Sequence, residues 1–212
     1  MRTIGFFLGL AVLAAPAGAA TIAVQHGNIV LDGKPITGSG RDLDPLLSPD
    51  GRHIVFERIG TGRPLQDCDA EATTSKPLEL WRINTDGSGA KRLLALHSDP
   101  DASKTLCAFD NAQFSSNGQL LYFETPAWAT SGAIHVLSLT TGKERFFLAG
   151  NGLKVLASCK NPKYRDDLIV GQHRYFVFSG SYDWDFVFTP DGKEVGPLGD
   201  GDHSTDIADA CG

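Results

Sequence analysis

A ten-residue pattern occurs twice in the chain and constrains its fold more than any other feature. Residues 47–56 (LSPDGRHIVF) align without a gap with residues 114–123 (FSSNGQLLYF). Each copy holds the end of an apolar strand, a turn, and a second strand that finishes on Phe. In the turn, Asp or Asn can bond its own backbone, and Gly51 or Gly118 can take the left-handed conformation that closes a three-residue hairpin loop. The pattern therefore predicts two equivalent β-hairpins.

Each hairpin is followed by two further strand-like runs that are separated by another turn. The runs cover 78–83 and 92–96 in the first copy, and 133–139 and 145–149 in the second. A third copy of this latter half occupies 184–198, and a fainter fourth occupies 28–37. Four short strands per unit, without a stretch of 3.6-residue periodicity, are typical of propeller blades. We therefore expect an all-β fold, a small or incomplete β-propeller of about four blades, each a four-stranded antiparallel sheet.

The repeated residues resemble the TolB-type (WD40-like) β-propeller repeat. That repeat has an apolar-Ser-Pro-Asp-Gly turn, an Ile-x-Phe strand, an apolar strand with an Asp-Gly-Ser-Gly-like turn, and a basic-apolar strand. The first copy follows it through residues 48–51 (SPDG), residues 86–89 (DGSG) and Arg92. The resemblance covers about residues 42–149 and implies a propeller. It leaves the function open, because such repeats occur in exported scaffolds and in domains of peptidases.

The N-terminal twenty residues have the pattern of a secretory signal peptide. Arg2 gives a positive start, residues 4–15 form an apolar and glycine run, and residues 17–19 (AGA) suit a signal peptidase. The apolar run is shorter than the roughly 20 residues that a permanent membrane helix needs. We expect cleavage near residue 20, a single domain over 21–212, and a periplasmic or secreted protein without a membrane anchor.

The length of this domain limits the number of blades. A blade needs roughly 40–45 residues, so that about 192 residues make at most about four, whereas TolB-like propellers are expected to have six. A four-bladed ring, an open arc of blades, and a ring completed by a second chain (a homo-oligomer) would each satisfy the length.

Four cysteines in an exported chain predict two disulfides. Their spacings contain no Cys-x-x-Cys pair, which disfavours a zinc site. Residues 57–77 and 97–110 are insertions that emerge on the same rim of a propeller, because each strand reverses direction, and each insertion carries one cysteine. This topology pairs Cys68 with Cys107 and, by elimination, Cys159 with Cys211.

The charge of the chain bears on its partners. With 19 basic and 25 acidic residues the net charge is −6, which argues against binding to nucleic acid. Loops on a rigid β scaffold often carry recognition. We therefore expect a binding module, without a cofactor, that contacts another envelope or extracellular protein through the acidic residues of the two insertions. These are Asp67, Asp69, Glu71, Asp99, Asp101 and Asp110.

Two other functions remain open. A small exported enzyme, a hydrolase or lyase, could gather Asp183, Asp185, His173 or His203 near the ring axis, although no motif assigns a catalytic residue. A calcium-stabilised structural protein could use the alternating carboxylates Asp200, Asp202 and Asp206 as metal ligands. That segment lacks the glycine and the distal glutamate of the EF-hand pattern.

Overall fold

The computed structural model describes residues 20–63, 65, 68, 77–198, 207 and 211. The expected signal peptide lies outside the described residues. The described strands form four antiparallel sheets, in which strands that are consecutive in sequence are neighbours. The N-terminal sheet contains β1 (Ile22–Gln25), β2 (Asn28–Leu31) and β3 (Lys34–Pro35). The second sheet contains β4 (Asp42–Leu47), β5 (His53–Ile59), β6 (Leu78–Asn84) and β7 (Lys91–Ala95). The third contains β8 (Asp110–Phe114), β9 (Leu120–Pro126), β10 (Gly132–Ser138) and β11 (Glu144–Ala149). The fourth contains β12 (Asn151–Val155), β13 (Leu168–Tyr175), β14 (Ser181–Phe188) and β15 (Glu194–Leu198).

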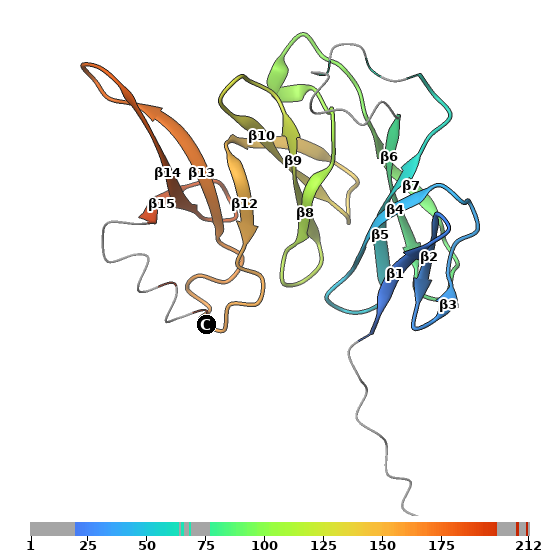
Figure 1. Ribbon diagram of the computed structural model, residues 1–212. Helices are drawn as coiled ribbons and strands as arrows, with labels where there is room; N and C mark the ends of the chain where they lie inside the picture. Colours follow the sequence, from blue (N-terminus) through green and yellow to red (C-terminus); the bar gives the residue numbers. More distant parts are fainter. Residues whose placement is uncertain are drawn as a thin grey trace, which may run out of the picture.

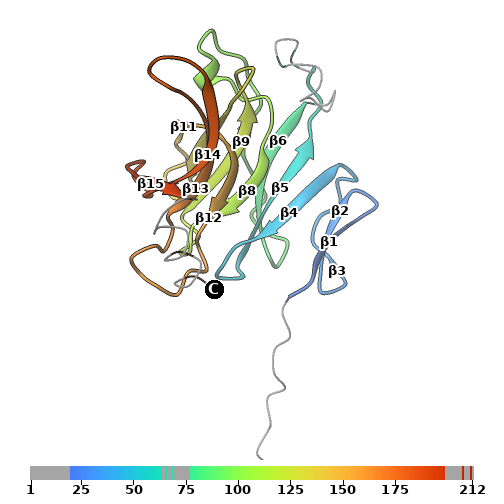
Figure 2. The same ribbon diagram turned by 60° about the vertical axis from the view of Figure 1, so that its left-hand side comes forward.

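The four sheets follow one another as an arc of blades. The N-terminal sheet lies at one end, the sheet β12–β15 lies at the other, and the two central sheets stand between them (Figures 1 and 2). Three blades are four-stranded, as the repeat predicts. The N-terminal unit differs from that prediction, because it has three strands and its β3 is only two residues long. Within one chain, the described residues form an open arc and not a closed four-bladed ring.

The repeated hairpins form as the sequence predicts. Gly51 and Gly118 both have a φ of 67°, and each donates its backbone N–H to the carbonyl of the serine that begins its turn, at 2.9 Å. The hydroxyls of these serines, Ser48 and Ser115, are buried and accept a backbone N–H from five residues later, at 3.0 Å in both copies. The two turns therefore share one hydrogen-bonding plan, which explains why the serine recurs.

A second repeated feature is a bulge in the first strand of each four-stranded sheet. The pairing of β4, β8 and β12 with the following strand shifts register, and the shift contains a residue with positive φ. These residues are Asp44 (44°), Asn111 (50°) and Gly152 (66°). Asn, Asp and Gly are the residues that tolerate this conformation best. The bulge extends the structural repeat to the last blade, where the sequence repeat is weak.

Apolar side chains fill the space between successive sheets. Between the N-terminal sheet and β4–β7 lie Ile29, Ile36, Ile54, Phe56 and Ile83. Between β4–β7 and β8–β11 lie Val55, Leu78, Leu80, Leu106, Phe109, Phe114, Leu121, Phe123 and Leu137. Between β8–β11 and β12–β15 lie Tyr122, Ile134, Val136, Leu153, Val155, Leu168, Val170, Phe186 and Phe188. Each junction thus has its own core, which fixes neighbouring blades to each other.

A separate apolar cluster and a disulfide lie on the far face of the last blade. Cys159 is bonded to Cys211, with the two Cα atoms 4.3 Å apart. Ile207 is 5% exposed and packs in a cluster with Tyr164, Ile169 and Val187. Ile207 and Cys211 therefore cover part of the last blade of the arc.

Ala102–Lys104 form a 3₁₀ turn, and Ile207 and Cys211 have helical backbone conformation. No helix among the described residues is long and apolar enough to cross a membrane.

Candidate functional site

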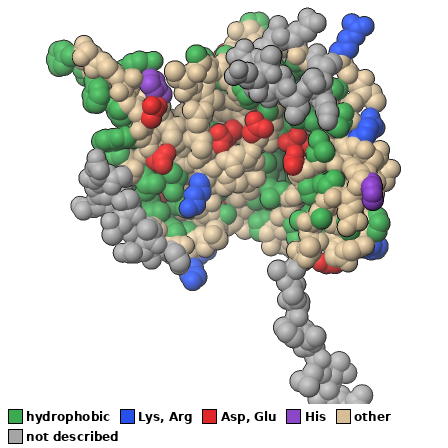
Figure 3. Space-filling view, viewed as in Figure 1, with side chains coloured by type: hydrophobic (Ala, Val, Ile, Leu, Met, Phe, Trp, Pro, Cys, Tyr) green, Lys and Arg blue, Asp and Glu red, His purple; other side chains and the backbone are tan. Residues whose placement is uncertain are grey.

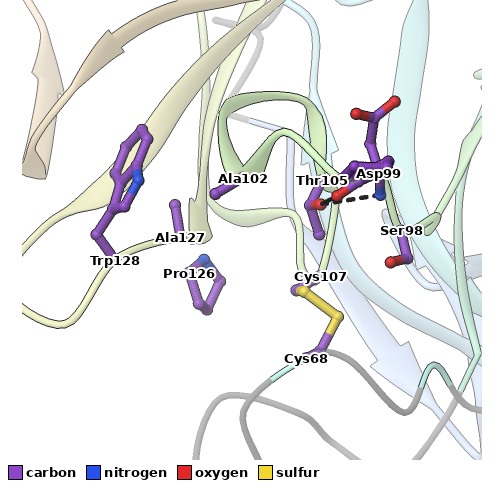
Figure 4. A pocket seen from close by; sticks show the side chains of 10 residues that line it. Cys68, Ser98, Asp99, Ala102, Thr105, Cys107, Pro126, Ala127 and Trp128 are labelled. Carbon is purple, nitrogen blue, oxygen red and sulfur yellow. Dashed lines mark hydrogen bonds between the residues drawn. A yellow bond between two sulfur atoms is a disulfide. The ribbon is translucent and has the colours of Figure 1, made fainter.

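The two inserted loops meet on one rim, as the topology predicts. A disulfide joins Cys68 to Cys107, with the Cα atoms 5.6 Å apart, so the loop after β5 is bound to the loop that precedes β8. Beside it lies a hollow of about 230 Å³ whose wall includes Asp99 and Trp128 (Figure 4). The Trp128 side chain is 43% exposed. This rim combines a rigid crosslink with an accessible aromatic ring.

The rim carboxylates that the structure describes have different roles. Asp99 accepts a bond from the backbone N–H of Asp101 at 2.9 Å. Asp101 in turn accepts from the backbone N–H of Ser103 at 3.0 Å and pairs with Lys104 at 3.1 Å. Both side chains therefore shape the 97–109 loop. Asp110 is exposed at the start of β8 and lies between two hollows. Asp67, Asp69 and Glu71 lie outside the described residues.

Three hollows follow the inner edge of the arc, where β4, β8 and β12 lie, and we call them together the acidic groove. The first, of about 380 Å³, lies between β4–β7 and β8–β11 and includes Asp44, Glu57 and Asp110. The second, also about 380 Å³, shares Asp110 with the first and includes Glu124. The third, of about 430 Å³, shares Asn151 with the second and includes His173, Asp183 and Asp185.

The groove carries charge of one sign. None of the described residues that line its three hollows is Lys or Arg. Figure 3 shows Asp and Glu side chains in a row across this face, over the three four-stranded sheets. The groove also reaches the rim, because Pro126 and Trp128 line both its second hollow and the hollow beside the disulfide.

Glu124 and its neighbours bind the third and fourth sheets together. Its carboxylate accepts the backbone N–H groups of Gly152 at 3.1 Å and Leu153 at 2.8 Å, and the Asn111 amide at 2.7 Å. The amides of Asn111 and Gln113 donate to the Leu153 carbonyl, both at 2.7 Å. These bonds satisfy the Glu124 carboxylate and hold the β12 bulge against β8.

The equivalent junction between the second and third sheets is built differently. Glu57 occupies the position of Glu124 in the repeat, and it is only 9% exposed. Its carboxylate makes no hydrogen bond or ion pair with any described residue. Asp44 stands where the next blade has Asn111, and Leu46 stands where it has Gln113, so the amide donors of the other junction are absent here. A hollow lined by carboxylates takes the place of the hydrogen-bonded contact.

Burial and neighbouring negative charge raise the pKa of two carboxylates of the groove. Burial, together with the charges of Asp44 and Asp110, raises the pKa of Glu57 from 4.5 to about 7. Partial burial, with Glu124 and Asp44 nearby, raises the pKa of Asp110. The groove therefore holds more negative charge than its surroundings compensate, and a cation that entered it would relieve this repulsion.

Other candidate residues lie in or near the third hollow. The His173 ring is 2.8 Å from the Asp183 carboxylate, whose side chain is 80% exposed, and it meets the Tyr175 ring edge-on. The hairpin of β13 and β14 then extends from the blade and ends on exposed apolar residues, including Val177 and Phe178. His203, Asp200, Asp202 and Asp206 lie outside the described residues. Within the described part of the chain, no group of three His, Cys, Asp or Glu side chains is placed to hold a metal ion.

Sequence reasoning missed Asp44, Glu57, Glu124 and Trp128. A signal for two of them was present, because the gap-free alignment of the copies continues one residue past Phe56 and Phe123 to Glu57 and Glu124. A repeated acid directly after a strand motif indicates a repeated role. The difference between the two roles depends on the facing strand and is visible only in the structure.

No known family model matches the chain, and no curated protein sequence matches it. Solved structures with a similar fold include dipeptidyl peptidase 4 of Porphyromonas gingivalis. It has a TM-score of 0.58 at 11% identity, over 88% of this chain and 32% of that one. TolB of Acinetobacter baumannii has a TM-score of 0.47 at 15% identity, over 84% of this chain and 40% of that one. The β-propeller domain of the Trilobed protease of Pyrococcus furiosus has a TM-score of 0.47 at 13% identity, over 74% of this chain and 43% of that one.

The chain thus spans less than half the length of each of these structures. Its own sheets are antiparallel blades in sequence order, and its fold is similar to that of dipeptidyl peptidase 4. The all-β, propeller-like fold expected from the repeat is confirmed. At identities this low the likeness concerns the fold, and activity has to be argued from the residues of this chain.

Proposed function

We propose that the protein is an exported, TolB-like binding module that holds a basic segment of another envelope or extracellular protein along its acidic groove. Two disulfides support export, since such bonds persist in oxidising compartments. The signal-like N-terminus points to the same compartment. The partner is defined by its chemistry, as a stretch of chain that carries several Lys or Arg side chains.

The observation that carries this proposal is that the three hollows of the groove adjoin one another. Its hollows share Asp110 and Asn151 and cross three blades, so one extended segment can contact all of them. Carboxylates line the whole length, and complementary charge gives such a surface both faster association and selectivity. Trp128, at the rim end, offers an aromatic face to a cation or an apolar side chain.

A defined peptide tests the proposal. A fluorescein-labelled ten-residue peptide of alternating Lys and Ser is titrated with the protein at low ionic strength, and binding is followed by fluorescence anisotropy. We expect saturable binding that weakens as NaCl is added, because salt screens charges near the surface. A peptide with Glu in place of Lys should not bind.

Matched variants show whether the groove is responsible. Asp110→Asn with Asp183→Asn removes two exposed carboxylates of the groove, and we expect about tenfold weaker binding from losing two partly exposed ion pairs. Asp86→Asn with Asp191→Asn removes the same charge from two exposed turns outside the groove. Asn suits such turns, as Asn117 shows at an equivalent one. Equal loss in both variants would mean that net charge alone attracts the peptide, and the proposal would fail.

A further inference from the structure

We propose that the hollow between the second and third sheets is a subsite for a primary alkylammonium group, with Glu57 as its anchoring anion. This inference rests on the proposed function and identifies the chemistry of one cation in the bound segment. It also goes further than the proposed function, because it predicts that a single ammonium group on a short apolar stem binds by itself.

The strand pattern of β5 directs Glu57 into this hollow. Val55 and Glu57 lie on the same face of β5, since side chains alternate along a strand. Val55 packs in the core between the second and third sheets. Phe56, on the other face, packs toward the N-terminal sheet. Glu57 therefore faces the third sheet, at the level of Asp110, and lines the hollow together with it.

A largely buried carboxylate without a partner among the described residues is costly to maintain. Burying an ionised group disfavours folding unless a partner or a hydrogen bond compensates it. The chain provides such compensation at the next junction, where Glu124 accepts three hydrogen bonds at 2.7–3.1 Å. At the Glu57 junction the amide donors are replaced by Asp44 and Leu46, which removes compensation and adds another negative charge. A cation from outside the chain can provide the positive partner that the Glu57 carboxylate lacks among the described residues.

The walls of the hollow select the kind of cation. Besides the carboxylates of Asp44, Glu57 and Asp110, the lining includes Leu46, Val55, Leu80 and Phe109. A hollow of about 380 Å³ is far larger than a single metal ion. Acidic groups beside apolar walls suit a ligand with an apolar stem and a charged end, as in the side chain of lysine. A free alkylamine shares that chemistry.

Small probes distinguish a lysine side chain from a free alkylamine as the natural ligand. N-acetyl-lysine methylamide, 1,4-diaminobutane and n-butylamine are each titrated at pH 8 into isotope-labelled protein, and backbone amide shifts are recorded by NMR. We expect all three to shift amides of β4, β5 and β8, and butanol and the ε-acetylated lysine probe to shift none. If n-butylamine binds and the diamine binds more tightly than the lysine probe, the natural ligand is a free polyamine. If only the diamine binds, a single ammonium group does not suffice and the subsite is wrong. If the lysine probe binds at least as well, the ligand is a side chain.

Glu57→Gln tests the anchor. We expect it to weaken the binding of n-butylamine at least tenfold, while Glu194→Gln, an exposed change on β15, leaves it unchanged. We also expect Glu57→Gln to be more stable than the wild type at pH 8, because the substitution removes an uncompensated charge. A residue needed only for the fold would give the opposite change, and a less stable variant would overturn the inference.

The outcome also separates this inference from the proposed function. If the Lys-Ser peptide binds through Asp110 and Asp183 but n-butylamine shifts no amide near Glu57, the subsite is wrong and the groove proposal stands. If neither probe binds, both are wrong.

Discussion

Glu57, whose carboxylate has no partner among the described residues, should make the stability of the protein depend on pH in a predictable direction. Burial, with the charges of Asp44 and Asp110, raises the pKa of Glu57 in the folded protein from 4.5 to about 7. Between these two pH values the folded state binds a proton that the unfolded state releases. The contribution of Glu57 is therefore complete below about pH 4.5 and is lost as the pH rises to about 7.

The size of this effect follows from the two pKa values. One pKa unit corresponds to about 1.4 kcal/mol, so a rise from 4.5 to about 7 predicts a loss of about 3 kcal/mol between pH 4.5 and pH 8. For a chain of this size that loss amounts to roughly 6–12 °C in melting temperature. Burial of the neutral Gln amide also has a cost, but this cost is the same at every pH.

Urea unfolding, followed by tryptophan fluorescence without reductant, measures the effect in the wild type and in Glu57→Gln at pH 4.5 and pH 8. The difference in free energy of unfolding between the two proteins should move by about 3 kcal/mol in favour of the variant as the pH rises. Asp110 and the other acids are present in both proteins, so this comparison reports Glu57 together with its interactions with Asp44 and Asp110. A difference that is independent of pH, or one that moves in favour of the wild type, would refute the reasoning.

Four other changes test separate parts of the structure. Replacing both Cys68 and Cys107 by Ser should lower the free energy of unfolding by up to about 4 kcal/mol, the chain-entropy value for a loop of this length, as measured in urea. Tyr122→Phe should raise the free energy of unfolding by about 1 kcal/mol, because the buried Tyr122 hydroxyl has no hydrogen-bond partner in the described part of the chain. Gly150→Ala should lower stability by more than about 1 kcal/mol, since its Cβ would lie 2.2 Å from a methyl group of Val170. Phe178→Ser should change the urea midpoint by less than the equivalent of about 0.5 kcal/mol, because the side chain is 98% exposed.

The sequence predicts the blades well where local chemistry decides the structure. The turns at Gly51 and Gly118 need a left-handed residue, and that requirement is visible in the repeat. The pairing of Cys68 with Cys107 follows from strand direction alone. The short β3 could not be predicted in this way, because the length of an edge strand depends on what packs beside it.

The candidate site was harder to predict because it lies between blades. Glu57 and Glu124 are equivalent in the sequence, yet one is unpaired and the other accepts three hydrogen bonds. The difference comes from strands that approach across a junction, and a repeat pattern does not describe such junctions. Asp99 and Asp101 are binding carboxylates by the sequence prediction, which stays a prediction; the fold shows in addition that they organise their own loop.

A crystal structure of the protein with the Lys-Ser peptide bound tests the central claim most directly. We predict that the peptide lies along the acidic groove, with one lysine Nζ within about 3.2 Å of the Glu57 carboxylate, as a charge-assisted hydrogen bond requires. A peptide bound elsewhere, for example on the exposed hairpin of β13 and β14, with the Glu57 hollow unoccupied, would contradict the account.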